Sequence, residues 1–110
     1  MANVYTVSLG RGRGGLNEQL ELFFVPGLDT YVLRDIVGFV FDTTPAYFQI
    51  FQTPPGGSPL LIYYAVVTGP STVHLDLRQV LAPGGRVFAS SGHSSWSTQL
   101  TGYHLLGQTA

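Results

Sequence analysis

The segment TVHLDLRQVL, residues 72–81, decides the class of fold because its apolar and polar side chains alternate with a period of two. Successive side chains of a β-strand point to opposite faces of a sheet, so this segment predicts a strand with one dry face and one wet face. The dry face carries Val73, Leu75 and Leu77, and the wet face carries His74, Asp76 and Arg78.

Similar apolar segments recur about every ten residues, which is typical of an all-β sandwich or barrel. The run LNEQLELFFV, residues 16–25, offers a short helix, but its second half fits a strand better. Gly38 indicates a bulge or a point of close packing. We therefore predict an all-β fold, an antiparallel β-sandwich of about eight strands with jelly-roll-like connections. The predicted strands cover residues 3–9, 20–25, 31–41, 46–52, 60–67, 72–81, 86–92 and 95–106.

The chain of 110 residues has the length of one ordinary domain, and we expect residues 1–110 to form a single β-sandwich. We expect residues 10–15 to form a flexible Gly/Arg loop and residues 107–110 to form a loose C-terminal tail. The opening residues lack the basic start and long apolar run of a secretory signal, so we expect the mature chain to begin at or near Met1. Cysteine is absent, so no disulfide or thiol chemistry is expected.

Charged residues make up only 10% of the chain, against roughly 25% in typical soluble domains. A surface so poor in charge is prone to association, and we expect other subunits to cover much of it. The alternative is a sparsely charged monomer rich in Ser, Thr and Gln. The net charge of −1 predicts no general attraction to nucleic acid or anionic lipid. Prolines and paired glycines interrupt the uncharged span 43–73, so we predict no membrane helix there.

The hexapeptide GRGRGG, residues 10–15, contains two of the five basic residues. Arginine binds phosphate or carboxylate through paired hydrogen bonds, and glycine lets a backbone approach a ligand closely. The spacing lacks the lysine and hydroxyl of a Walker loop, and phosphate binding normally recruits more basic groups. Three interpretations stay open: an assembly-contacting loop, a contact with an acidic protein, and a nucleic-acid contact. We favour the first and take Arg11 and Arg13 as candidate partner-binding residues.

Two histidine clusters could carry chemistry. His74 and Asp76 could share a metal ion, with His104 as a third ligand if the fold brings it near, but a solvated polar face is the simpler interpretation. His93 lies among serines in SSGHSSW, residues 90–96, yet no third catalytic group or oxyanion pocket can be named. We therefore predict no enzymatic activity, no metal and no cofactor.

Four aromatic residues could together stack on a sugar ring, namely Tyr47, Tyr63, Tyr64 and Trp96. Aromatic residues at strand spacing more often belong to a core or to a subunit interface. We take Tyr63, Tyr64 and Trp96 as candidate partner-binding residues. A carbohydrate-binding module that recognises the host wall stays an alternative function.

Three runs of the sequence resemble small β-sandwich virion proteins of tailed bacteriophages, namely residues 23–40, 80–92 and 100–106. In that family a strand ends in Val-Pro and a short turn leads to a strand like VLRDIV, as at Val25-Pro26 and residues 32–37 here. A turn of the form Leu-x-Pro-Gly then precedes another strand, as at residues 81–84. An ending like Ser-Gly-Tyr is similar to residues 101–103, whereas GRGRGG has no counterpart in that pattern.

The resemblance implies a non-enzymatic structural protein of the virion, so no catalytic residue carries over. The expected function is a capsid decoration or cement protein that binds the lattice of the major capsid protein, with a tail or baseplate component as the alternative. The expected partners are the major capsid protein, other virion subunits and further copies of this chain. A trimer would suit the threefold sites of a capsid. The expected location is the virion, assembled in the host cytoplasm.

Overall fold

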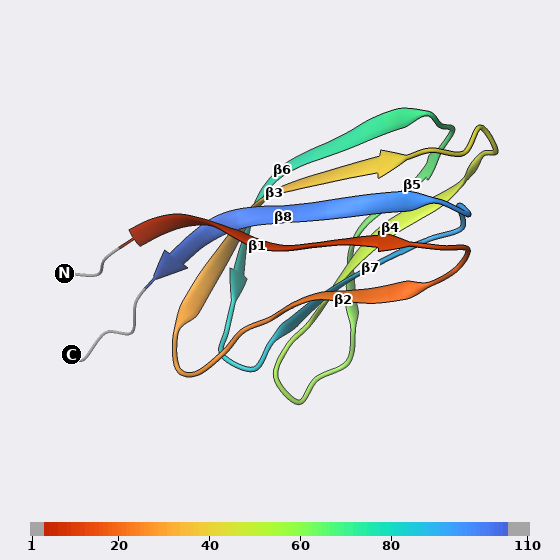
Figure 1. Cartoon of the computed structure of the whole chain (residues 1–110). Helices are drawn as coiled ribbons and strands as arrows, with labels where there is room; N and C mark the ends of the chain where they lie inside the picture. The colour runs from red at the N-terminus through yellow and green to blue at the C-terminus, as the bar shows by residue number, and fades with distance from the viewer. Residues whose placement is uncertain (1–3, 106–110) are drawn as a thin grey trace.

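The structure, a computed structural model, describes residues 4–105. None of these residues belongs to a helix with the length and apolar character that crossing a bilayer requires. The described strands, drawn in Figure 1, are β1 (Val4–Gly14), β2 (Gln19–Phe24), β3 (Thr30–Val40), β4 (Ala46–Thr53), β5 (Leu60–Val67), β6 (Ser71–Leu81), β7 (Arg86–Ser91) and β8 (Trp96–Leu105).

The strands form two four-stranded antiparallel sheets. Sheet A has the order β1-β8-β3-β6, and sheet B has the order β2-β7-β4-β5. Figure 1 shows β8 running between β1 and β3 in one layer, with β2 and β7 in the other layer. Apart from the β4–β5 hairpin, each consecutive pair of strands crosses from one sheet to the other, which is the connection pattern of a jelly roll. The predicted eight-stranded, jelly-roll-like β-sandwich is therefore confirmed.

The core lies between the two sheets because alternate residues of each strand point inward. The wet and dry faces predicted for β6 are confirmed, since His74, Asp76 and Arg78 are exposed and Val73, Leu75 and Leu77 are half-buried. Gly38 of β3 is confirmed as a point of close packing, because a Cβ there would lie 2.6 Å from Phe48 Cζ. The buried apolar residues are Leu22, Val25, Leu33, Ile36, Val40, Phe48, Ile50, Leu81, Val87, Ala89, Trp96 and Leu100.

The predicted loop over residues 10–15 is wrong for residues 10–14, which belong to β1 and pair with β8. The glycines face the interior, where neighbouring groups leave no room for a side chain. A Cβ on Gly10 would collide with the carbonyl oxygen of Leu22, and a Cβ on Gly14 would collide with the Trp96 ring. The pattern G-R-G-R-G is therefore a period-two strand in which glycine takes the inward positions. The predicted tail over residues 107–110 lies outside the described residues.

Candidate functional site

A hollow on the outer face of sheet A, which we call the arginine groove, runs along β8 between β1 and β3. The strand register builds it, because residues opposite one another across a sheet share a face. One row across the sheet joins Arg11, Gln99 and Val37, and the next row joins Arg13, Ser97 and Phe39. The groove has a volume of about 460 Å³. The structure thus brings both predicted arginines to one surface.

Arg11 and Arg13 are exposed, and neither takes part in an ion pair among the residues whose side chains are described. Arg34 and Arg86, in contrast, each contact a carboxylate, at 3.4 Å and 3.0 Å respectively. The Arg13 guanidinium carbon lies 5.5 Å from the centre of the Phe41 ring, a cation–π distance. The groove therefore presents positive charge that the described part of the chain does not neutralise.

The histidines considered as metal ligands contact different carboxylates. His74 Nε2 lies 3.3 Å from Asp35 on the adjacent strand, and Asp76 contacts Arg34 instead. His104 stacks on Tyr31 with a ring-centre separation of 4.3 Å and lies 2.9 Å from Asp29. Over residues whose side chains are described, no three groups suited to metal ligation come together. The structure therefore does not unite His74, Asp76 and His104.

The serine-rich loop around His93 is part of the interior. His93 is only 1% exposed, and its Nε2 donates a hydrogen bond to the Val67 carbonyl at 2.8 Å. Its Nδ1 lies 2.5 Å from Ser91 Oγ, and Ser91 is also buried. A buried serine beside an imidazole that is held by a backbone carbonyl has no open path to a substrate. The arrangement ties the β7–β8 connection to the end of β5.

Asp42 closes the same end of the sandwich. It accepts hydrogen bonds from the hydroxyl of Ser94 at 2.6 Å and from the backbone N–H of Ser94 at 2.5 Å. These two hydrogen bonds, the hydroxyl first, lower the pKa of Asp42 below its ordinary value because they stabilise the ionised carboxylate. The contact links the β3–β4 connection to the β7–β8 connection.

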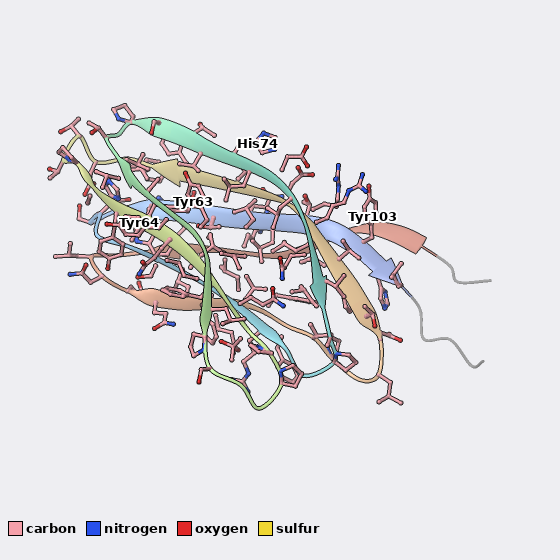
Figure 2. The ribbon with its side chains drawn as sticks, turned by 180° about the vertical axis from the view of Figure 1, so that it is seen from behind. Tyr63, Tyr64, His74 and Tyr103 are labelled. Atoms are coloured by element: carbon pink, nitrogen blue, oxygen red, sulfur yellow. The ribbon has the colours of Figure 1, made fainter. Side chains whose placement is uncertain are left out.

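The four aromatic residues do not form one platform. Trp96 is fully buried, donates its indole N–H to the Gly15 carbonyl at 2.9 Å and meets Phe48 edge to face. The prediction that Trp96 binds a partner is therefore wrong, because its side chain fills the core. Tyr63 and Tyr64 lie on β5 (Figure 2), where Tyr63 packs against the core and Tyr64 is 56% exposed. Tyr47, on β4, donates its hydroxyl to Asn17 Oδ1 at 2.8 Å.

The second candidate surface, which we call the apolar edge, is the free side of β5 at the margin of sheet B. Its exposed members are Leu60, Leu61, Tyr64 and Val66, each more than half exposed. Leu61 lies opposite Phe51, and Phe51 lies opposite Phe88 on β7, so half-buried aromatic rings continue the apolar surface across the sheet. The sequence indicated an apolar strand here but not its place at the margin of the sheet.

No protein-family model matches this chain. No curated protein matches its sequence either. Solved structures with the same fold include a chain of the T13 particle of infectious bursal disease virus (IBDV), with a TM-score of 0.63 and 9% identity over 94% of this chain and 31% of that chain. A chain of the Gx strain of the virus gives a TM-score of 0.59 and 10% identity over 100% of this chain and 34% of that chain. This chain thus spans about a third of those viral chains.

A chain from Bacillus endospore appendages, described as disulfide-linked pili, gives a TM-score of 0.51 and 11% identity over 97% of this chain and 92% of that chain. The present chain has no cysteine, so it cannot form links of that kind. At identities this low, the likenesses show the fold alone. The chain is a β-sandwich similar in fold to a part of viral capsid proteins and to a pilus subunit.

Proposed function

We propose that this chain is a non-enzymatic structural protein of a bacteriophage virion, a capsid decoration protein that binds the lattice of the major capsid protein. The apolar edge is the observation that carries this proposal. An exposed strand edge presents unpaired N–H and C=O groups, and natural proteins protect such edges with charges, internal prolines or short length. β5 is eight residues long and contains neither a charged residue nor a proline.

β6, an edge strand of sheet A, differs from β5 because it carries charged side chains that face water. β6 forms the neighbouring margin of sheet A and alternates exposed His74, Asp76 and Arg78 with inward apolar residues. Charges on β6 oppose strand pairing, whereas β5 carries no charge, and a single bulge at Ile62 interrupts its register. The difference supports a role in which β5 is covered by another subunit.

The composition and the fold support the same proposal. Only 10% of the residues are charged, and the chain exposes 6049 Å² of surface, so much of that surface is weakly hydrated. The jelly roll is also the fold of the matching part of the viral capsid chains. A chain whose surface is poor in charge suits a permanent place among other subunits.

The proposed mechanism is association through repeated modest contacts. Each docked contact raises the effective concentration for the next contact, so a symmetric oligomer binds a lattice more tightly than one copy does. We propose a homo-oligomer, with a trimer suited to threefold lattice sites. The partners are the major capsid protein and further copies of this chain. The place of action is the virion, which assembles in the host cytoplasm.

A tail or baseplate component would use the same two surfaces, the arginine groove and the apolar edge. This alternative differs from capsid decoration only in the part of the virion to which the protein binds. The carbohydrate-binding alternative is less well supported, because the four aromatic residues proposed as a platform are divided between core and surface. No observation on the described residues favours it over assembly.

The test is addition of the purified chain to capsids from a phage whose gene for this chain has been deleted. The expected result is saturable binding and density at symmetry-equivalent lattice sites by electron cryomicroscopy. Density confined to the tail would favour the alternative, and absence of binding to whole particles would contradict the proposal. Val66→Lys should reduce binding, whereas Val80→Lys, which adds the same charge at an exposed valine of β6, should not.

A further inference from the structure

We propose that the arginine groove binds an extended acidic segment of a neighbouring virion subunit, with two carboxylates spaced two residues apart on Arg11 and Arg13. The inference rests on the proposed function for the identity of the partner. It concerns a surface separate from the apolar edge, because the groove lies on the outer face of sheet A and β5 belongs to sheet B.

Local charge points to an anion. On the same outer face, His74 contacts Asp35 and Asp76 contacts Arg34, so the two carboxylates of this face already have basic neighbours. No such carboxylate contacts Arg11 or Arg13 over the part of the chain whose side chains are described. The net charge of the whole chain is −1, so the groove is a local concentration of two positive charges and not part of a general basic surface. An incoming carboxylate would accept paired hydrogen bonds from each guanidinium.

Spacing points to an extended segment. Arg11 and Arg13 are alternate residues of β1, and alternate residues of a strand lie roughly 6.6 Å apart on the same face. An extended peptide has the same two-residue repeat, so acidic residues at positions i and i+2 match both arginines at once. Adjacent acidic residues would point to opposite sides of such a peptide, and only one would reach the groove.

The remaining walls favour a peptide over nucleic acid. Val37 and Phe39 form an apolar wall opposite the arginines, and the uncharged side chains of Ser97 and Gln99 lie between the walls. A phosphate backbone normally recruits a longer row of basic groups than two arginines. A peptide with acidic residues toward β1 and an apolar side toward β3 is complementary to both walls. β8 is already paired on both sides, so the peptide would lie on the sheet face and not extend the sheet.

The test uses synthetic peptides and the full chain at low ionic strength, with affinity measured by calorimetry and binding mapped by NMR. The probe is acetyl-Val-Glu-Val-Glu-Val-amide, and the matched peptides carry Gln for Glu or place the two Glu residues side by side. We expect the alternating Glu peptide to bind about tenfold more tightly than either control, and its affinity to fall as salt is added. Resonance shifts should map to Arg11, Arg13 and Gln99.

The matched variants separate the groove from net charge. The double variant Arg11→Ser with Arg13→Ser should lose the peptide preference, whereas Arg78→Ser with Arg86→Ser removes the same charge outside the groove and should keep it. The proposal would be overturned if the two double variants bound the alternating Glu peptide with equal affinity. It would also be overturned if the natural chain bound the alternating and the adjacent Glu peptides equally well. Tighter binding of a single-stranded thymidine oligonucleotide through the same arginines would also overturn it. Peptide binding without capsid binding would contradict the proposed function and leave the groove assignment standing.

Discussion

The two outer faces of the sandwich meet water in different ways. On sheet A, charged and polar side chains alternate with the core residues, and the arginine groove places two arginines beside the contacts of Asp35 with His74 and of Asp76 with Arg34. On sheet B, exposed apolar side chains gather at β5. Half-buried Phe51 of β4 and Phe88 of β7 extend this apolar surface toward the middle of the sheet. One face is therefore suited to a specific anionic contact, and the other face is suited to burial of apolar surface.

The arginine groove and the apolar edge would therefore make different contributions to the free energy of binding. Burial of apolar area supplies most of the free energy of association and depends little on salt. Charged contacts at a rim contribute mainly to orientation, specificity and association rate, and salt weakens them. If both surfaces act as proposed, the apolar edge holds the subunit in place and the arginine groove selects its neighbour.

Trp96 is buried between the two sheets and belongs to neither outer face, so its replacement should give the largest change in stability. Trp96→Ala should lower the free energy of unfolding by about 3–5 kcal/mol, because it leaves a cavity beside Phe48 and removes the donor for the Gly15 carbonyl. Urea unfolding followed by circular dichroism measures this, since the chain has a single tryptophan and the variant lacks it. An unchanged midpoint would mean that Trp96 is a surface residue after all.

The second prediction tests whether the apolar edge differs from the other sheet margin. Val66→Lys should weaken self-association at least about tenfold, because a charge on a strand edge must lose its hydration when another chain covers it. Val80→Lys is the matched control, since Val80 of β6 is 60% exposed and Val66 of β5 is 65% exposed. Sedimentation velocity over a range of concentrations measures both variants. A similar loss in both would remove the distinction between β5 and β6.

The strands could be predicted from the sequence wherever the alternation was carried by side chains that differ in polarity. The wet and dry faces of β6 follow directly from residues 72–81, and β5 has the predicted bounds of 60–67. In contrast, the sequence predicts a loop for residues 10–14 because glycine gives no hydrophobic signal. Glycine is required there by Leu22 and Trp96, which are distant in sequence, so local pattern alone could not show the strand.

The candidate sites were partly predictable for a related reason. The sequence singled out Arg11, Arg13 and Tyr64, which are exposed, but it could not show that β8 lies beside β1 and forms a groove with it. Trp96 was misassigned although its strand carried a usable signal. Trp96 alternates with the polar residues Ser97 and Gln99, and this alternation indicates an inward-facing tryptophan.

The third prediction separates binding from stability within β1. Replacing Arg11 and Arg13 together with serine should lower the free energy of unfolding by no more than about 1 kcal/mol, because both side chains are exposed, no described carboxylate pairs with them, and the contact of Arg13 with Phe41 is weak. Gly14→Ala on the same strand should cost about 1–3 kcal/mol, because its Cβ would collide with the Trp96 ring. Thermal unfolding of both variants measures the difference. A large loss in the serine variant would show that the arginines support the strand.

The smallest prediction concerns Asp42, which lies at the end of the sandwich and belongs to neither binding surface. Because the pKa of Asp42 in the folded chain lies below its ordinary value of 3.8, ionised Asp42 stabilises the fold above that value. This contribution is lost as the pH falls through the folded pKa. Asp42→Asn should therefore be less stable than the natural chain near neutral pH, and the two melting temperatures should converge as the pH falls below 3.8 and through the lower pKa of the folded chain.

Melting temperatures measured as a function of pH, with Ser94→Ala as the partner variant, test this assignment. Ser94→Ala removes the hydroxyl donor but keeps the backbone N–H, so its loss of stability should be smaller than that of Asp42→Asn and should fade over the same acid range. A gap between Asp42→Asn and the natural chain that stays constant down to about pH 2 would assign the effect to packing and not to charge. Neither variant should alter peptide binding or self-association, because neither Asp42 nor Ser94 lines the arginine groove or belongs to β5. If either did, the two surfaces would not be independent of the loops that join the sheets.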